Sequence, residues 1–72
     1  MSTAELADIL RRNYNAPPSG KKTVEIHLFG IKYAAALKRV SIDEVVERAG
    51  ISNTYGTELR KMVNLAPYVD VK

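Results

Sequence analysis

Apolar positions in residues 41–64 recur at spacings that predict two short helices joined by a tight turn. The first helix would turn three apolar side chains towards a core: Val45, Val46 and Ala49. Gly50 comes next, and glycine is the residue that most often ends a helix in the left-handed conformation. We therefore expect the backbone to bend at Gly50 and Ile51 to enter the core.

Polar residues mark where these two helices begin. Ser41 and Glu44 have the spacing of a capping box, and Ser52 is a candidate cap for the second helix. The second helix, residues 53–64, has an apolar face made of Tyr55, Leu59, Met62 and Val63. Its opposite face is polar and consists of Asn53, Thr54, Thr57, Arg60, Lys61 and Asn64.

Residues 41–64 resemble the helix-turn-helix of small bacterial and phage DNA-binding proteins. The resemblance covers about a third of the chain and rests on Val45, Ala49, Gly50, Ile51, Ser52 and Leu59. Two positions depart from the usual motif: Val46 stands where a small Ala is common, and Gly56 where a β-branched apolar residue usually packs. The resemblance implies DNA binding by the second helix.

The whole chain, and residues 26–34 in particular, also resembles short proteins described only as helix-turn-helix-like. That second resemblance implies a fold and names no substrate.

The N-terminal segment predicts another capped helix. Ser2 and Glu5 again have capping-box spacing, and an apolar side follows at Leu6, Ile9, Leu10 and Tyr14. Pro17 and Pro18 end this helix because proline lacks the amide hydrogen. Residues 15–20 are therefore a predicted loop, and Lys21 and Lys22 at its end form either a basic arm that touches phosphates or a plain solvated loop.

Residues 23–39 admit two interpretations. The alternation of Val24, Ile26 and Leu28 with polar residues would suit a strand over residues 24–28. As a helix, the segment has one apolar side at Val24, Leu28, Ile31 and Ala35, and a second at Ile26, Phe29, Tyr33, Leu37 and Val40. We favour the helix, packed between neighbours on both sides. Gly30 inside it is then acceptable if another helix crosses closely there.

The C-terminal residues 68–71 alternate as a short extended segment would, after the last helix ends near Pro67. Such a segment needs a partner for its backbone groups. It would pack on its own domain, pair with a second subunit, or pair with residues 24–28.

Composition narrows the classes of function. The 72 residues suit one domain, residues 1–72, and are few for an enzyme with an enclosed pocket. The chain has no Cys and a single His27 without ligand partners, so we expect no metal site, no cofactor and no catalytic residue. No apolar stretch is long enough for a signal peptide or a membrane span, and we expect a cytoplasmic protein.

The net charge of +3 permits binding to nucleic acid without requiring it. Residues 41–64 are slightly acidic, because three bases (Arg48, Arg60, Lys61) accompany four acids (Asp43, Glu44, Glu47, Glu58). Phosphate neutralisation would therefore come mainly from bases outside the motif: Lys21, Lys22, Lys38 and Arg39, with Arg11 or Arg12 as further candidates.

The sequence thus predicts an all-α bundle of four helices that contains a helix-turn-helix. Our leading hypothesis is a small transcriptional regulator that places residues 53–64 in the DNA major groove, as a homodimer. The DNA-contacting residues would be Asn53, Thr54, Thr57, Arg60 and Lys61, with the four outlying bases. The alternatives are a protein-interaction module of the same fold and an oligomerisation domain with residues 68–71 at its interface.

Overall fold

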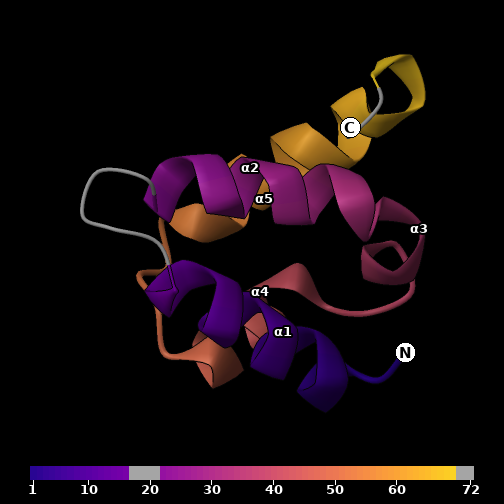
Figure 1. The fold of residues 1–72 in the computed structure, drawn as a ribbon. Helices are drawn as coiled ribbons and strands as arrows, with labels where there is room; N and C mark the ends of the chain where they lie inside the picture. The colour runs from indigo at the N-terminus through magenta and orange to yellow at the C-terminus, as the bar shows by residue number, and fades with distance from the viewer. Residues whose placement is uncertain (17–21, 70–72) are drawn as a thin grey trace.

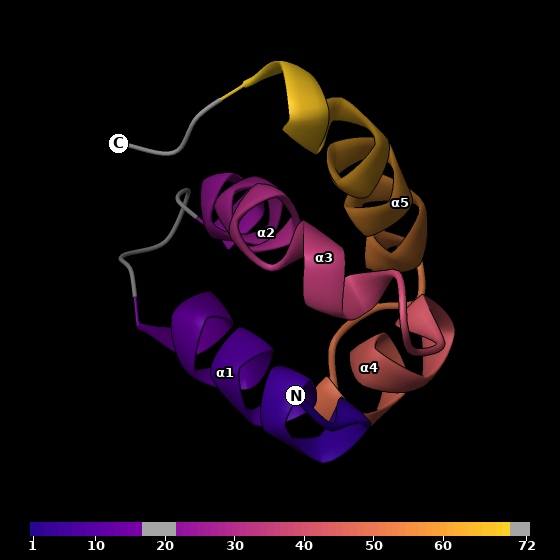
Figure 2. The same ribbon diagram turned by 90° about the vertical axis from the view of Figure 1, so that its right-hand side faces the viewer.

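The computed structural model describes residues 1–16 and 22–69, and all its regular structure in these residues is helical. The elements are α1 (Thr3–Asn15), α2 (Lys22–Lys32), α3 (Ala34–Leu37), α4 (Ile42–Ala49), α5 (Tyr55–Leu65) and the 3₁₀ helix η1 (Ala66–Tyr68). Figures 1 and 2 show α2 lying beside α5, with α1 and α4 together on the other side of the molecule. The all-α class predicted from the sequence is confirmed.

The predicted cap of α1 forms in full. The Ser2 hydroxyl accepts a hydrogen bond from the Glu5 amide at 3.1 Å, and the Glu5 carboxylate accepts one from the Ser2 amide at 3.0 Å. These two bonds satisfy amides that the first turn of a helix leaves without partners. Leu6 and Leu10 are then fully buried, as their spacing predicted.

Residues 24–28 are helical, so the strand alternative is wrong. The single helix expected over residues 23–39 is also wrong in one respect, because the helix bends at Tyr33 (φ −107°, ψ 21°) into α2 and α3. A straight helix of that length would be roughly 25 Å long, close to the longest extent of the molecule, 28 Å. The bend instead keeps Ala34 and Leu37 on the common core, and the described residues therefore hold five α-helices rather than four.

Helices α2 and α5 approach each other closely at Gly30. A Cβ atom at this position would lie 2.6 Å from the Cβ of Met62, which is far inside van der Waals contact. His27 lies beside Glu58 and Gly30 beside Met62, so the two helices run in the same direction. The expectation that a neighbouring helix crosses at Gly30 is confirmed.

The core lies between these helices and α1 and α4. Its buried apolar members are Leu6, Ala7, Leu10, Ile26, Phe29, Ala34, Leu37, Val45, Val46, Ala49, Leu59 and Val63. Phe29 stacks at a tilt against Tyr33, with ring centroids 5.0 Å apart. The core thus joins residues from five helices. The second apolar side predicted for residues 23–39 does not join it, because Val24, Leu28 and Ala35 are exposed.

The C-terminus departs from the expected extended segment. Residues 66–68 form a 3₁₀ turn, in which the Val69 amide donates to the Ala66 carbonyl at 3.4 Å. Val69, which follows this turn, has an extended backbone (φ −139°, ψ 157°), and residues 70–71 of the predicted segment lie outside the described residues. Pairing with residues 24–28 as strands is excluded by the helix there. No helix of the described residues has the length and apolarity that crossing a membrane requires.

Candidate nucleic-acid interface

The turn between α4 and α5 has the predicted left-handed residue. Gly50 has φ 76° and ψ 25°, and its amide donates to the Glu47 carbonyl at 3.1 Å. Ile51 then turns inward and packs against the core. The cap of α4 is only half formed, because the Ser41 hydroxyl accepts from the Glu44 amide at 3.3 Å while the Glu44 carboxylate lies 3.4 Å from Arg48.

The second helix begins later than predicted. Ser52 does not cap α5; its hydroxyl lies 3.0 Å from that of Thr54 and accepts from the Thr54 amide at 3.4 Å. These bonds hold residues 52–54 in a turn, and α5 therefore starts at Tyr55 instead of Asn53 and ends at Leu65. Ser52 belongs to a side-chain-stabilised turn of the kind that competes with a helix cap.

Two tyrosines, one at the end of α1 and one at the start of α5, pack against each other. The rings of Tyr14 and Tyr55 meet edge to face with centroids 5.5 Å apart, and the Lys22 ammonium lies 4.7 Å from the centre of the Tyr14 ring. A hydrogen bond with Tyr14, together with partial burial, raises the pKa of Tyr55 above its ordinary value of 10.0. This contact fixes where the N-terminal half of α5 stands against the rest of the protein.

α5 separates its apolar and polar faces as predicted. Gly56, Leu59 and Val63 are buried and Tyr55 and Met62 are partly buried. The predicted contact residues of this region are all exposed: Asn53, Thr54, Thr57, Arg60 and Lys61. Amide, hydroxyl and ammonium groups of this kind can hydrogen-bond base edges and phosphates.

Arg60 is already engaged within the protein. Its guanidinium donates to the Asp43 carboxylate in the first turn of α4 at 2.5 Å. Gly56 lies beneath this pair, since a Cβ there would stand 3.0 Å from the same Asp43 oxygen. The sequence alone does not predict this contact, because no local signal reveals a pair separated by 17 residues.

Lys61 is held more loosely. Its ammonium lies 3.9 Å from Glu58, at the outer limit of an ion pair, and its side chain is 64% exposed. Glu58 makes a closer contact with His27 of α2 at 3.0 Å. Lys61 can therefore exchange its weak internal partner for a phosphate or a base at little cost.

The remaining predicted bases fall near the two ends of α5. Lys22 begins α2 beside Tyr14, and Lys38 and Arg39 follow α3, exposed and without an acidic partner among residues 1–16 and 22–69. Lys21 lies outside the described residues. An open hollow of about 410 Å³ lies where α3, α4 and α5 meet, and it is lined by Leu37, Lys38, Val40, Ser41, Ile42, Arg60, Val63 and Asn64.

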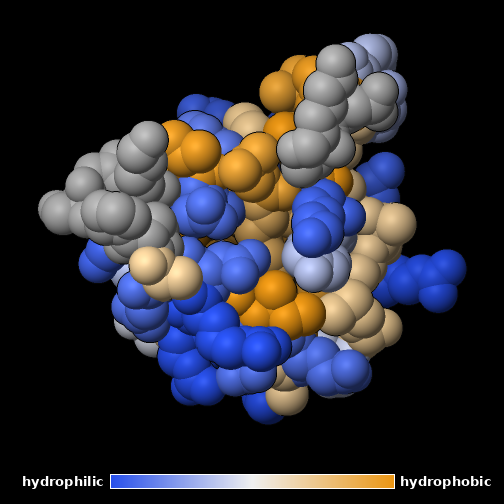
Figure 3. Space-filling model, viewed as in Figure 1, coloured by the Kyte–Doolittle hydropathy of each residue, from blue (hydrophilic) through white to orange (hydrophobic). Residues whose placement is uncertain are grey.

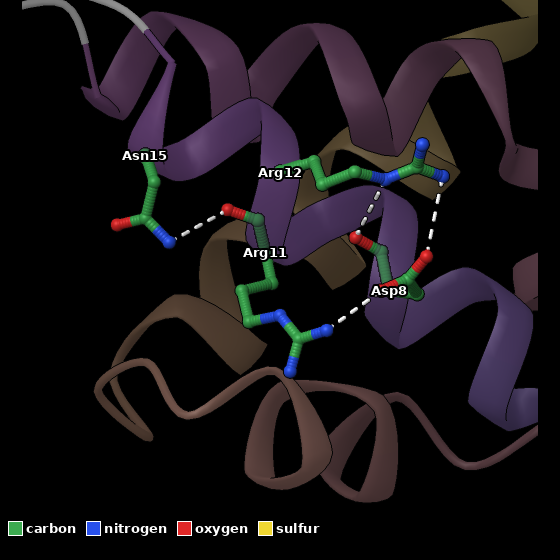
Figure 4. Close-up of polar contacts among 4 residues, drawn as sticks. All are labelled: Asp8, Arg11, Arg12 and Asn15. Atoms are coloured by element: carbon green, nitrogen blue, oxygen red, sulfur yellow. Dashed lines mark hydrogen bonds and ion pairs between the residues drawn. The ribbon is translucent and has the colours of Figure 1, made fainter.

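The arginines of α1 are turned towards their own helix (Figure 4). Arg11 donates to Asp8 at 2.7 Å, Arg12 lies 3.3 Å from the other oxygen of the same carboxylate, and Asn15 donates to the Arg11 carbonyl at 2.9 Å. Two guanidinium groups thus share one carboxylate, so Asp8, Arg11 and Arg12 together carry a single net positive charge. In the part of the chain that the structure describes, no cluster of three His, Cys, Asp or Glu side chains could hold a metal ion.

Comparison of the sequence with known protein families identifies one family for this chain. The family model described as an HTH-like domain matches residues 2–72 of the chain. No curated protein and no solved structure shows a significant match.

Proposed function

The chain belongs to the HTH-like domain family, and we propose that it binds double-stranded DNA with the outward face of α5, and the turn just before it, in the major groove. The observation that carries the proposal is the common exposure of Asn53, Thr57 and Lys61 beside a turn that Gly50 fixes. A recognition helix needs such a face, because base edges can be reached only by side chains free of the protein's own core.

Each residue has a role that suits its chemistry. The Asn53 amide matches the donor and acceptor of adenine, and the Thr57 hydroxyl and methyl suit a phosphate or a thymine methyl group. Lys61 would bind phosphate or guanine. Lys38 and Arg39 would supply phosphate contacts beside the hollow at the start of α4.

Such a protein would regulate transcription or another DNA transaction. A module of this size covers little DNA, and two copies on paired half-sites would raise both affinity and specificity. We therefore include a homodimer in the proposal.

The direct experiment is titration of the protein onto random duplex DNA at two salt concentrations, followed by selection of bound sequences. Three or four phosphate contacts per protomer predict a loss of affinity of roughly 40- to 150-fold between about 50 and 200 mM salt. Lys61→Ala should weaken binding about fivefold and reduce the salt slope, whereas Asn53→Ala should chiefly relax sequence preference.

Arg12→Ala is the matched control, because it also removes one positive charge, and the pairing of Arg12 with Asp8 on α1 excludes this sequence-based phosphate candidate from the proposed interface. Binding that is absent at low salt, or that Lys61→Ala and Arg12→Ala weaken equally, would refute the proposed use of α5.

A second candidate is a protein-interaction module of the same fold. Its support is the pairing of every base of residues 41–64 with an acid: Arg48 with Glu44, Arg60 with Asp43, and Lys61 with Glu58. This pairing leaves the motif with a weak electrostatic field. Failure to bind DNA at low salt, together with an intact fold, would favour this candidate.

A further inference from the structure

Helix α2 carries apolar side chains on two opposite sides. Its inner side places Ile26 and Phe29 in the core and Gly30 against α5. Val24, Leu28 and Ile31 follow at spacings of four and three residues, which puts them together on the other side of the helix. We call this second side the outer face of α2.

The outer face is exposed in the folded protein. Val24 is 50% and Leu28 39% exposed, although both are large apolar residues, and Ile31 is partly buried. The apolar pattern of residues 23–39 predicts a neighbouring helix here, and none of the described helices covers this side. Three further apolar residues are exposed where α5 ends and η1 follows: Leu65, Tyr68 and Val69. Figure 3 shows apolar side chains over α2 and over this end of the molecule on one face.

Charges beside the outer face point to its occupant. Glu25 and Lys32 lie seven residues apart and therefore on the same flank of α2. Neither has an ion-pair partner in residues 1–16 and 22–69. If two α2 helices pack antiparallel about a two-fold axis near Leu28, Glu25 of one copy faces Lys32 of the partner subunit, and symmetry repeats the pair.

We propose that the outer face of α2 binds a second copy of this chain in that antiparallel arrangement. The spacing of Val24, Leu28 and Ile31 is that of the apolar seam of a two-helix coiled coil, and flanking charges set helix orientation in such seams. A two-fold contact needs a self-complementary surface, and the opposite charges of Glu25 and Lys32 on one flank provide it.

The size of the surface sets the expected affinity. An 11-residue helix is only about 16 Å long, whereas a standard interface buries about 800 Å² per partner. The outer face of α2 alone is smaller than that, so the proposed interface also includes the exposed Leu65 and Tyr68, at the end of α5 and in η1, which contacts α2. We expect a dimer with a dissociation constant on the order of 10–100 µM. This dimer forms without DNA, so its failure would leave DNA binding by α5 untouched.

The first test is sedimentation equilibrium of the full chain without DNA, from about 1 to 500 µM, a range that brackets the expected constant. The average mass should rise from the monomer's 8.0 kDa towards twice that value. Leu28→Asp should weaken the dimer at least tenfold. Ala4→Asp, which adds the same charge at an exposed position of α1, should not change it. A monomer at every concentration, or a dimer that Leu28→Asp leaves intact, would overturn the proposal.

The second test addresses orientation through charge reversal. Glu25→Lys places two ammonium groups opposite each other, and Lys32→Glu places two carboxylates, so each single variant should weaken the dimer several-fold. The double variant restores the pairs in reverse and should recover the affinity. Circular dichroism would check that each variant keeps its helices. Single reversals without effect, or a double variant as weak as the singles, would exclude the antiparallel arrangement.

Discussion

Arg60 on α5 and Asp43 on α4 form an ion pair that crosses the two helices directly above Gly56. Because glycine has no side chain, the Asp43 carboxylate can lie over the start of α5, where a Cβ at position 56 would stand 3.0 Å from its oxygen. The pair also occupies the one arginine on the outward side of α5, so the helix presents mainly neutral hydrogen-bonding groups and Lys61. Gly56, which departs from the usual motif, thus leaves the space in which Asp43 pairs with Arg60.

Replacing Asp43 by Asn should strengthen DNA binding about three- to tenfold at low salt, because it removes a negative charge and releases Arg60. The cost in stability should stay within about 1 kcal/mol, since both side chains are well exposed. Filter binding or fluorescence anisotropy would measure the affinity. Glu47→Gln removes a charge from the same helix at an exposed position and should have a smaller effect. Equal gains from the two variants would mean that Arg60 contributes nothing.

The Gly30→Ala and Gly56→Ala substitutions should change the stability of the fold by different amounts or in opposite directions. Gly30→Ala forces a Cβ to within 2.6 Å of the Met62 Cβ, an atom fixed to the α5 backbone, and should destabilise the fold by about 1–3 kcal/mol. Gly56→Ala meets only the end of the exposed Asp43 side chain and gains helix propensity, so its effect should lie within about 1 kcal/mol. Urea unfolding of both variants measures the difference. A Gly30→Ala protein as stable as wild type would contradict the close crossing.

The Gly50→Ala substitution would measure the cost of backbone strain without a steric clash. No atom lies within 4 Å of a Cβ built there, so the cost comes only from the positive φ and should be about 1–2 kcal/mol. Gly50→Asn should cost less, because asparagine visits this conformation more readily. Thermal unfolding would rank the three proteins. An alanine variant more stable than the asparagine variant would mean that the turn tolerates another backbone conformation.

The cap of α1 predicts a dependence on acid. Hydrogen bonds from the backbone and side chain of Ser2 lower the pKa of Glu5 below its ordinary value of 4.5. A carboxyl whose folded-state pKa is lowered adds stability above its unfolded value and loses it as the pH falls through the folded value. The stability of wild type should therefore fall below about pH 4.5 more than that of Glu5→Gln.

Unfolding by urea at neutral pH and in acid would measure this difference. Glu47→Gln, at an exposed position without a described ion-pair partner, should keep the wild-type acid dependence. A Glu5→Gln protein with an unchanged acid dependence would show that the cap does not form in solution.

Local patterns predicted the features that arise locally. The cap at Ser2, the left-handed Gly50 and the apolar face of α5 each depend on residues within one or two turns, and sequence spacing reveals them. The Gly30 crossing was also foreseen, because a glycine inside a helix indicates close packing. Features that depend on distant partners were missed, chiefly the Arg60–Asp43 pair and the contact between Tyr14 and Tyr55.

The bend at Tyr33 was missed for a different reason. The apolar pattern continues through it without interruption, since Phe29, Tyr33 and Leu37 all face the core. Periodicity reports which side of a helix is apolar and does not report where the small core ends. The exposure of the residues proposed to contact DNA follows from the pattern, and their use in binding stays a prediction.

The helix-turn-helix segment, residues 41–64, depends on the rest of the chain for most of its packing. α4 packs mainly on α1 and α5 packs mainly on α2, more than either packs on the other. An excised peptide of these residues would lose most of its buried surface and should remain a disordered coil. The angle at which α5 is presented to a ligand is therefore a property of the whole cooperative unit, and it exists only once the N-terminal half of the chain has folded beneath it.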